Sequence, residues 1–535
     1  MELKKILLLF FIGLNFSLFQ CERILAVWPV VSRTHFSLGM SFFEALAEKG
    51  HEITLISPYV QKVAHENIKM IKLNGATEAV MQRSQMTFKE LRNLSVIEQL
   101  NEKIDLGAFM VDFALEHENM KNILKSGEKF DLFIYDAFYN DVLLGIPHFM
   151  KIPVIAFNSI GQNQQTNEMT RTAINPATIP NILLEFNNEM DFFERIRNTA
   201  VTLTELYYYH FNYLPKQTEL LKKHFDEMVL GKLPNLIDLI HNVNLVFLNS
   251  HPLMQSAQIL PPNCIEIGGI QVKAKLDEVH PDLDAMMNRA KFGIVYVSLG
   301  GHFRSADLPE EKLDMFINVF TALKALDIVV LWKFETIELK ERHAHNVVVG
   351  PWMPQQEILN HKNLRAFITH GGLLSLMEAV QYGKPVIGIP LLNDQQRNMA
   401  QAEKQGYGIK LDYDNMSEDM LREAIDAVFN DTSYKANAER MSEYFKGSPI
   451  MATDKATWYV EHVIKTNGAK HLQTTATKLS FWQVHLIDQL LVVALVIVFI
   501  ITVLSSTVKY LREKFQKRAK SNIKASVRKS KFKSN

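Results

Sequence analysis

A strand–helix–strand unit near the amino terminus constrains the fold more than any other feature. The run Arg23–Trp28 is largely apolar, as in a strand that is buried on both faces. Phe36–Lys49 then places apolar side chains on one helical face, and Gly50 stands where a helix would end. Ile53–Ser57 is a second apolar run of strand length. Two buried strands joined by one helix form a right-handed parallel unit, so we predict an α/β fold.

Similar apolar runs recur in two series along the chain. The first series continues at Leu132–Tyr135, Val154–Phe157, Leu245–Leu248 and Cys264–Ile267, and the second comprises Gly293–Ser298, Ile328–Lys333, Val347–Val349, Ala366–Thr369 and Pro385–Ile389. The polar stretch 273–289 between them lacks a strand pattern. We therefore predict two doubly wound, Rossmann-like domains over residues 22–276 and 291–485, joined by a linker at 277–290.

The first 21 residues have the pattern of a secretory signal peptide. Lys4 and Lys5 precede the apolar core Ile6–Leu14, which is too short to span a bilayer comfortably. We expect cleavage near Cys21, although no pair of small residues marks the site. An uncleaved membrane anchor is the alternative interpretation of residues 1–21.

A second apolar run, Gln489–Val508, contains 20 residues without a charge. As a helix it would be about 30 Å long, which is one hydrocarbon thickness, so we predict a transmembrane helix at 486–508. A buried core helix is the alternative, but it fits poorly because the basic tail 509–535 follows at once. Such a flank belongs on the cytosolic side of a membrane.

With a cleaved signal peptide, this arrangement predicts a single-pass type I membrane protein whose body is lumenal. Lys531 and Lys533 lie five and three positions from the end and resemble a dilysine retrieval signal, which predicts the endoplasmic reticulum membrane. The alternative is that both lysines simply attract anionic lipid. Lumenal exposure agrees with three glycosylation sequons, at Asn93, Asn415 and Asn430.

Charge and cysteine content exclude other classes of protein. Residues 509–535 carry 11 basic side chains and one acidic one, so the other 508 residues, with 47 basic and 57 acidic side chains, have a net charge of −10. That sign argues against nucleic-acid binding by the folded body. The chain has only two cysteines, Cys21 and Cys264, which excludes a disulfide scaffold and any cysteine-rich metal site.

Residues 165–240 differ from the rest because they are predicted to be helical and apolar, with few strands. Leu206–Tyr213 contains four tyrosines and one phenylalanine. We interpret these rings mainly as core packing. As a group, the helices could instead wall a pocket for an apolar molecule or rest on a bilayer face.

Polar side chains follow several predicted strands, at the sheet edge where ligands bind in parallel α/β folds. These residues include His35, Asp136, Ser298, Gly300, His370, Asp394 and Gln395. His370-Gly371-Gly372 is followed by a predicted helix, and such a helix N-terminus favours a phosphate. No G-x-G-x-x-G follows a strand and no Walker loop is present, so NAD and P-loop nucleotide binding are disfavoured.

Residues 352–398 contain, in order, the motifs W-M-P-Q, F-I-T-H-G-G-L-L-S-L-M-E, G-K-P and G-I-P-L-L-N-D-Q. This region resembles the signature of the family 1 UDP-glycosyltransferases, which are GT-B enzymes that modify small lipophilic molecules. The similarity extends to the signal peptide, the anchor and the basic tail, and the motif wording is most like that of arthropod UDP-glucosyltransferases. The resemblance implies two Rossmann-like domains that face each other across a cleft, and a function in detoxification.

The resemblance implies how the chain would bind the nucleoside and the sugar of the donor. Trp352 would stack on the uracil ring, and Gln355 would hydrogen-bond it. Glu378 would accept hydrogen bonds from the ribose hydroxyls. Asp394 and Gln395 would bind the hexose hydroxyls. The resemblance also implies a diphosphate site made of His370, Gly371, Gly372, Ser375, Ser298 and Gly300.

The resemblance further implies that His35 is the general base. It would remove the proton from the acceptor hydroxyl as that oxygen attacks the anomeric carbon, a task that suits imidazole because its ordinary pKa is about 6.5. His35 stands just before the predicted helix Phe36–Lys49. Asp136 would bind the other ring nitrogen and fix the tautomer.

Two positions depart from the pattern of many family members. Leu374 replaces an Asn after H-G-G, and Gly301 replaces a Ser after S-x-G. Each change removes one polar group near the donor, which we interpret as altered binding of the donor.

The leading hypothesis is an inverting, metal-independent transferase that moves a hexose, preferably glucose, from a UDP-sugar to a small lipophilic acceptor. The UDP-sugar is a co-substrate and no cofactor is expected; a homo-oligomer is compatible with the sequence. A UDP-glucuronosyltransferase is the nearest alternative. The other two are a non-catalytic, membrane-anchored carrier of lipophilic ligands and a GT-B phosphorylase. The sequence names neither the acceptor nor whether it is modified on O, N, S or C.

Overall fold

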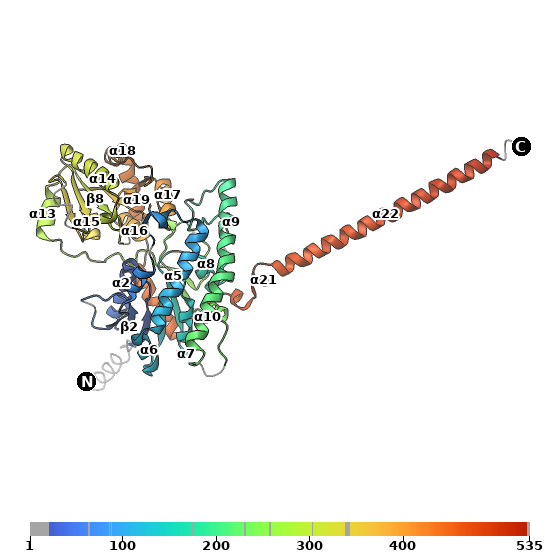
Figure 1. Ribbon diagram of the computed structural model, residues 1–535, viewed down its shortest axis with the longest axis horizontal. Coiled ribbons are helices and arrows are strands. Elements are labelled where there is room, and N and C mark those ends of the chain that lie inside the picture. The colour runs from blue at the N-terminus through green and yellow to red at the C-terminus, as the bar shows by residue number, and fades with distance from the viewer. Residues whose placement is uncertain are drawn as a thin grey trace, which may run out of the picture. The chain divides into compact units, whose positions relative to one another are not determined.

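The computed structural model describes residues 21–531, except for 63–64, 85, 87, 173–174, 229–231, 256–257, 302 and 337–342. Apart from Cys21, the predicted signal peptide lies outside the described residues, as does Lys533. The chain divides into one unit that ends at Thr477 and a second that begins at Lys478 (Figure 1).

The first unit contains two parallel sheets. The first sheet has seven strands in the order β3-β2-β1-β4-β5-β6-β7. Every neighbouring pair is parallel. The strands are β1 (Arg23–Val27), β2 (Glu52–Ser57), β3 (Ile68–Lys72), β4 (Leu132–Asp136), β5 (Val154–Asn158), β6 (Leu245–Leu248) and β7 (Cys264–Glu266).

The second sheet has six strands in the order β10-β9-β8-β11-β12-β13, again all parallel. Its strands are β8 (Ile294–Ser298), β9 (Val329–Lys333), β10 (Val347–Gly350), β11 (Leu364–Thr369), β12 (Val386–Gly388) and β13 (Gly408–Lys410). In both sheets, successive strands are added first on one side of the first strand and then on its other side. This change of side lies between β1 and β4 in the first sheet and between β8 and β11 in the second. Such a switch point opens a crevice at the carboxyl ends of the strands.

Helices cover both sheets. Those of the first half are α2 (Arg33–Glu48), α3 (Ala76–Arg83), α4 (Phe88–Arg92), α5 (Val96–Glu116), α6 (Glu118–Lys125), α7 (Gly145–Met150), α8 (Gln164–Thr170), α9 (Phe192–Tyr208), α10 (Leu214–Phe225), α11 (Leu236–His241) and α12 (Pro252–Gln255). Those of the second half are α13 (Pro281–Arg289), α14 (Glu310–Ala322), α15 (Gln355–Asn360), α16 (Leu373–Gln381), α17 (Gln395–Lys404), α18 (Glu418–Asn430), α19 (Thr432–Lys446) and α20 (Ala452–Lys465).

The last of these helices, α20, returns to the first half of the chain. Ala456, Val460 and Val463 of α20 are buried in the same apolar cluster as β1 and α2. Nearby, the Asn244 amide donates to the carbonyl of Gly468 at 2.8 Å. The end of the second half therefore holds the two halves together.

The central strands are fully buried because their side chains are apolar on both faces. In β1, Ile24, Leu25, Ala26 and Val27 have no exposed surface. Odd and even positions enter different clusters, so each face of the sheet packs its own layer of helices. This is the pattern expected for a parallel sheet covered on both sides.

Several details differ from the sequence-based expectation. Strand β3 reads I-K-M-I-K and has a partly exposed edge, which hid it from a search for continuous apolar runs. The predicted linker contains α13, whose first helical residue is Pro281 and whose N-cap is His280. The aromatic run is only half core: Tyr209 and Tyr213 are buried, whereas Phe211 is 71% exposed.

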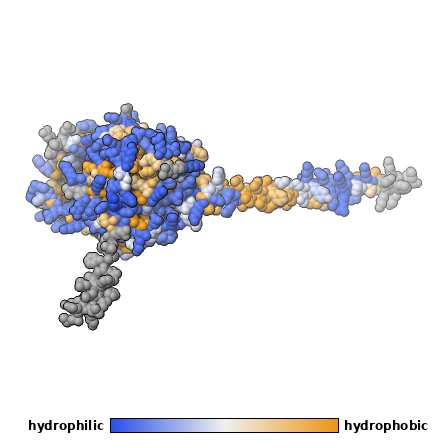
Figure 2. Space-filling model, turned by 90° about the horizontal axis from the view of Figure 1, so that it is seen from below, coloured by the Kyte–Doolittle hydropathy of each residue, from blue (hydrophilic) through white to orange (hydrophobic). Residues whose placement is uncertain are grey.

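The second unit contains α21 (Phe481–Val484) and the long helix α22 (Ile487–Lys531). Helix α22 is long and apolar enough to cross a membrane, as the predicted transmembrane segment requires. It continues without a break into the basic tail, and Figure 2 shows the change from apolar to polar residues along it.

Candidate active site

The structure brings together the two residues expected to carry the chemistry. His35 Nδ1 lies 2.7 Å from Asp136 Oδ2. Asp136 is the last residue of β4 and has no exposed surface, while the His35 side chain is 14% exposed. A carboxylate can only accept, so Nδ1 carries the proton and donates it, which leaves Nε2 as the acceptor. The Ser159 hydroxyl donates to the other oxygen, Oδ1, at 3.0 Å and fixes the carboxylate.

The local sequence explains the position of His35. Helix α2 begins at Arg33 rather than Phe36, because Ser32 is its N-cap and accepts a hydrogen bond from the His35 amide. His35 is therefore inside the first turn rather than before it. Its carbonyl accepts from Trp28 Nε1 at 3.0 Å, which ties this turn to the end of β1.

The H-G-G loop follows β11 and leads directly into α16. Gly372 is the N-cap of α16 and offers no side-chain cap, so the first amides of the helix remain for a ligand. A Cβ at Gly372 would lie 2.5 Å from His370 Nε2, and one at Gly300 would lie 2.6 Å from the same ring. Gly300 also has a φ of +91°, so only glycine fits here. The His370 ring is thus held between the two predicted phosphate-binding loops.

These loops lie close to His35 and Asp136, the predicted catalytic pair of the first half. A Cβ built on Gly301 would be 3.9 Å from Oγ1 of Thr34, the neighbour of His35. Leu374 packs against the apolar cluster of the first sheet, and its carbonyl accepts from the Gln271 amide at 3.3 Å. Both departures from the family pattern therefore lie where the halves meet, and Leu374 makes an apolar contact there.

Glu378 is a buried carboxylate with two amide partners. Its Oε2 accepts from Gln355 Nε2 at 2.8 Å, and its Oε1 accepts from Gln356 Nε2 at 3.2 Å. Gln355 also donates to the Ser375 hydroxyl at 3.3 Å, so three predicted donor-site residues form one network. Burial raises the pKa of Glu378 to about 7, although both amides act to lower it. A buried carboxyl group with a raised pKa is typical of a binding site.

The raised pKa makes a prediction about stability. Because the folded state holds a proton on Glu378 that the unfolded chain releases near pH 4.5, stability is full below that pH and falls as the pH rises through 7. Glu378→Gln removes the charge, so at pH 8 we expect it to be more stable than the wild type by about 2–3 kcal/mol, shrinking toward pH 5. Thermal unfolding of both chains at the two pH values measures this. An equal difference in stability at both pH values would show that burial does not raise the pKa of Glu378.

The residues expected to bind the hexose stand at the start of α17. Asn398 donates to Asp394 Oδ2 at 2.7 Å and to the carbonyl of Gly371 at 3.1 Å, which links the predicted hexose-binding residues to the H-G-G loop. Gln395 Oε1 accepts from the amides of Leu391 and Leu392, so its NH₂ group is left to donate. Lys103 on α5 interacts electrostatically with Asp394 across the two halves, and burial lowers the pKa of its ammonium.

Two predicted donor residues lie in contrasting surroundings. The Trp352 side chain follows β10 and is 80% exposed, so its ring is open to solvent. Ser298, the last residue of β8, is only 2% exposed, and it pairs in register with Thr369, the residue before His370.

Sequence reasoning missed five residues in this region. Ser159 and Lys333 lie at or after the ends of β5 and β9, so the strand-end rule could have found them. The Lys333 ammonium donates to the Gly300 carbonyl at 2.6 Å. Gln356 is hidden by its similarity to Gln355, and Asn398 lies one turn after Asp394. Lys103 has no sequence signal because it is one of many polar residues on a long helix.

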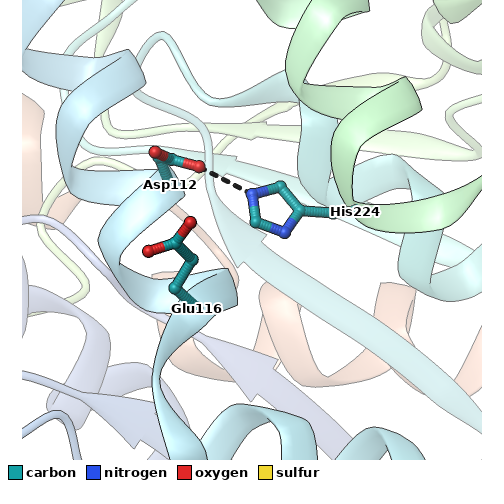
Figure 3. Close-up of side chains that lie close together, drawn as sticks. All are labelled: Asp112, Glu116 and His224. Carbon is teal, nitrogen blue, oxygen red and sulfur yellow. Dashed lines mark hydrogen bonds and ion pairs between the residues drawn. The ribbon is translucent and has the colours of Figure 1, made fainter.

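One cluster elsewhere has the composition of a metal site. Asp112, Glu116 and His224 bring their ligand atoms within 4.8 Å of one another, where α5 meets α10 (Figure 3). The Lys223 ammonium already bonds Asp112 at 2.8 Å and Glu116 at 2.6 Å. Burial works to raise the pKa of Asp112, but hydrogen bonds from Lys223 and His224 outweigh it and keep the pKa low. Because the Lys223 ammonium already pairs with both carboxylates, we interpret this cluster as an ion-pair network between two helices.

Comparison with known proteins agrees with this geometry. The family described as "UDP-glucoronosyl and UDP-glucosyl transferase" matches residues 23–525. The chain belongs to this family of UDP-glycosyltransferases. The transferase is 30% identical over 472 residues to UDP-glucosyltransferase 2 of Dactylopius coccus, which covers 87% of this chain and 88% of that protein. It is 27% identical over 504 residues to 2-hydroxyacylsphingosine 1-beta-galactosyltransferase of Mus musculus, which covers 93% and 90%.

Solved structures show the fold of the transferase. The glycosyltransferase VinC in complex with DTDP has a TM-score of 0.57 at 16% identity, over 83% of this chain and 100% of that chain. The glycotransferase of kitacinnamycin has a TM-score of 0.55 at 17% identity, over 83% and 98%. The predicted fold class, GT-B with two Rossmann-like halves, is confirmed.

Proposed function

We propose that this transferase moves glucose from UDP-glucose to a hydroxyl of a small lipophilic acceptor, with inversion at the anomeric carbon. The observation that carries the proposal is the 2.7 Å contact between His35 Nδ1 and the buried Asp136 carboxylate. A histidine held in this way presents Nε2 as a base and has a fixed partner for the charge it acquires.

The reaction follows from the placement of these groups. The acceptor oxygen gives its proton to Nε2 of His35 while it forms a bond to the anomeric carbon. The bond from that carbon to the β-phosphate oxygen breaks, and UDP leaves with the electron pair. The amides at the start of α16 and the His370 side chain would stabilise the charge that develops on the diphosphate. Asp136 would stabilise the imidazolium until it releases the proton.

The donor would lie along the carboxyl edge of the second sheet. Trp352 would stack on uracil, and the exposed face of its ring supports this. Glu378 would take the ribose hydroxyls from a position that Gln355 and Gln356 already fix. Asp394 would accept from hexose hydroxyls and Gln395 would donate to them, since its oxygen is engaged with the backbone. No cofactor or metal is needed for these steps.

A donor panel tests the proposal. Microsomes containing the full chain are incubated with UDP-glucose, UDP-glucuronate or UDP-galactose and a library of phenols, beside microsomes with the His35→Ala chain. We expect glycoside formation from UDP-glucose above all, and only with the wild type. Preference for UDP-glucuronate would replace the sugar assignment but keep the reaction. Tight binding of phenols without any transfer would instead indicate a carrier of lipophilic ligands.

We also propose that the body is lumenal in the endoplasmic reticulum and that the tail after about Val508 is cytosolic. The three sequon asparagines Asn93, Asn415 and Asn430 are exposed, which supports glycosylation. Protease added to sealed microsomes should remove only the tail, and detergent should open the body to digestion. Digestion of the body in sealed vesicles would refute this topology. Changing Lys531 and Lys533 to Ala should release the protein from the endoplasmic reticulum.

A further inference from the structure

Helix α9 turns polar side chains toward the protein and a row of apolar side chains away from it. Its buried side chains are the polar residues Asn198, Thr202 and Glu205. Apart from Arg197 and Ala200, the exposed side chains of the helix are large and apolar, and the π-helical turn Tyr209–Tyr213 that continues it adds one more. We call them the α9 stripe: Phe192 (61% exposed), Phe193 (76%), Ile196 (53%), Leu203 (59%), Tyr207 (59%) and Phe211 (71%).

The α9 stripe is one continuous face. Apart from the adjacent pair Phe192 and Phe193, its members recur at intervals of three, four and seven residues, which places them on one side of a helix. Between its ends the helix rises by about 30 Å. Tyr207 and Phe211 contact each other at 4.8 Å between ring centroids. Figure 1 shows α9 at the outer edge of the first half.

The polar face of α9 is anchored, so the helix cannot turn to bury the stripe. The Asn198 amide donates to the carbonyls of Pro176 and Ile179 at 2.7 and 2.8 Å. The Glu205 carboxylate accepts from the Asn181 amide at 2.7 Å. Rotation would break these bonds and leave buried polar groups without partners. A fixed apolar face of this length marks an interaction surface.

The chain itself indicates what covers this surface. The first unit ends at Thr477 and the membrane-length helix α22 begins at Ile487. The nine residues between them span at most about 30 Å when fully extended. The body is therefore held beside the bilayer at all times, whereas a second copy or a soluble partner must be recruited. Trp482 in this connection is 60% exposed, and tryptophan favours the membrane interface.

We propose that the α9 stripe lies in the interface of the bilayer into which α22 inserts. The helix would lie parallel to the membrane plane, with its aromatic and aliphatic side chains among the acyl chains and its polar face toward the protein. This proposal rests on the anchor and on the inverted amphipathicity of α9, and it is independent of which sugar or acceptor the transferase uses.

Site-directed fluorescence in nanodiscs tests it. The full chain carries Cys21→Ser, and the buried Cys264 stays unlabelled. A nitrobenzoxadiazole label is placed on Leu203→Cys or Phe211→Cys, and the matched control is Met81→Cys, an apolar position that is 70% exposed on α3. Each phosphatidylcholine disc holds one chain, with or without doxyl-labelled lipid. A cooperative thermal unfolding transition at the wild-type temperature shows that each labelled chain is folded.

We expect doxyl lipid to quench the two stripe labels and to leave the Met81 label unchanged. Iodide in the buffer should quench the stripe labels clearly less than the Met81 label, because side chains among the acyl chains are shielded from the aqueous ion. Equal iodide quenching at all three positions, with no effect of doxyl lipid, would overturn the proposal. Protection from iodide without doxyl quenching would also overturn it, because protein or ligand would then cover the stripe. Protection from iodide that appears only in discs holding two chains would overturn the proposal as well, because a second copy would then cover the stripe.

Discussion

Replacing His35 with Ala should lower the turnover of an alcohol acceptor by roughly 10²–10⁴-fold, which is the usual contribution of a positioned general base. The imidazole is the group that Asp136 holds at 2.7 Å, and alanine leaves nothing to accept the acceptor's proton. UDP affinity should barely change, because the residues expected to hold UDP belong to the second sheet. Initial rates and calorimetric titration with UDP measure the two effects.

The control for this substitution is His148→Ala, which removes an exposed histidine from α7 and should leave both quantities unchanged. Asp136→Asn should also lower turnover, because an amide can donate to Nδ1 and so favour the wrong tautomer. Near-normal turnover by His35→Ala would contradict the assignment of the base.

Replacing Glu378 with Ala should weaken UDP binding by about 1–3 kcal/mol, because ribose hydroxyls would be left without an acceptor in a closed site. Asp394→Ala should spare UDP, which has no hexose, and should depress transfer. The difference arises because Glu378 lies in a network with Gln355 and Ser375, whereas Asp394 lies at the start of α17. Calorimetry of UDP against each variant, beside transfer rates, separates the two roles.

Glu423→Ala, which changes an exposed glutamate on α18, is the control for these variants. If Asp394→Ala lost UDP affinity as severely as Glu378→Ala, Asp394 would not be a hexose ligand. The sugar end of the site would then need a different set of residues.

The strands of the sheet centres were predictable because they are continuously apolar. The sequence-predicted strand Arg23–Trp28 differs from β1 by one residue, and Asp136 was expected at the end of its strand. Of the four edge strands, β7 and β10 were predicted, whereas β3 and β13 were not. Strand β3 alternates lysine with apolar residues, and β13 has only three residues, so neither has a long buried run.

The candidate site was predictable where a residue follows a strand or stands in the family motif, and less so for the residues that hold those side chains in place. His370 follows the end of β11 and His35 follows the loop after β1, whereas Glu378 lies within α16 and comes from the family motif alone. The roles of all three stay predictions. Ser159 follows the end of β5 but has no motif of its own, and its hydrogen bond to Asp136 depends on β4 and β5 being neighbours in the sheet.

Helix α9 shows the limit of periodicity. Its apolar spacing is that of a helix with one buried face, and the aromatic run Leu206–Tyr213, which overlaps its end, was expected mainly in the core. The apolar spacing identifies which side chains share one face of the helix, but it does not show whether that face contacts protein, solvent or membrane. Only the burial of Asn198 and Glu205 reveals that the apolar side points away from the protein.

The anomeric configuration of the product tests the central claim most directly. The purified full chain is incubated with UDP-glucose, which is α-linked, and a phenol acceptor, and proton NMR gives the coupling of the anomeric proton while released UDP is quantified. Direct attack assisted by His35 predicts a β-glucoside and one UDP for each glucoside formed. An α-glucoside would require a covalent intermediate or attack from the leaving-group face, and it would contradict this account.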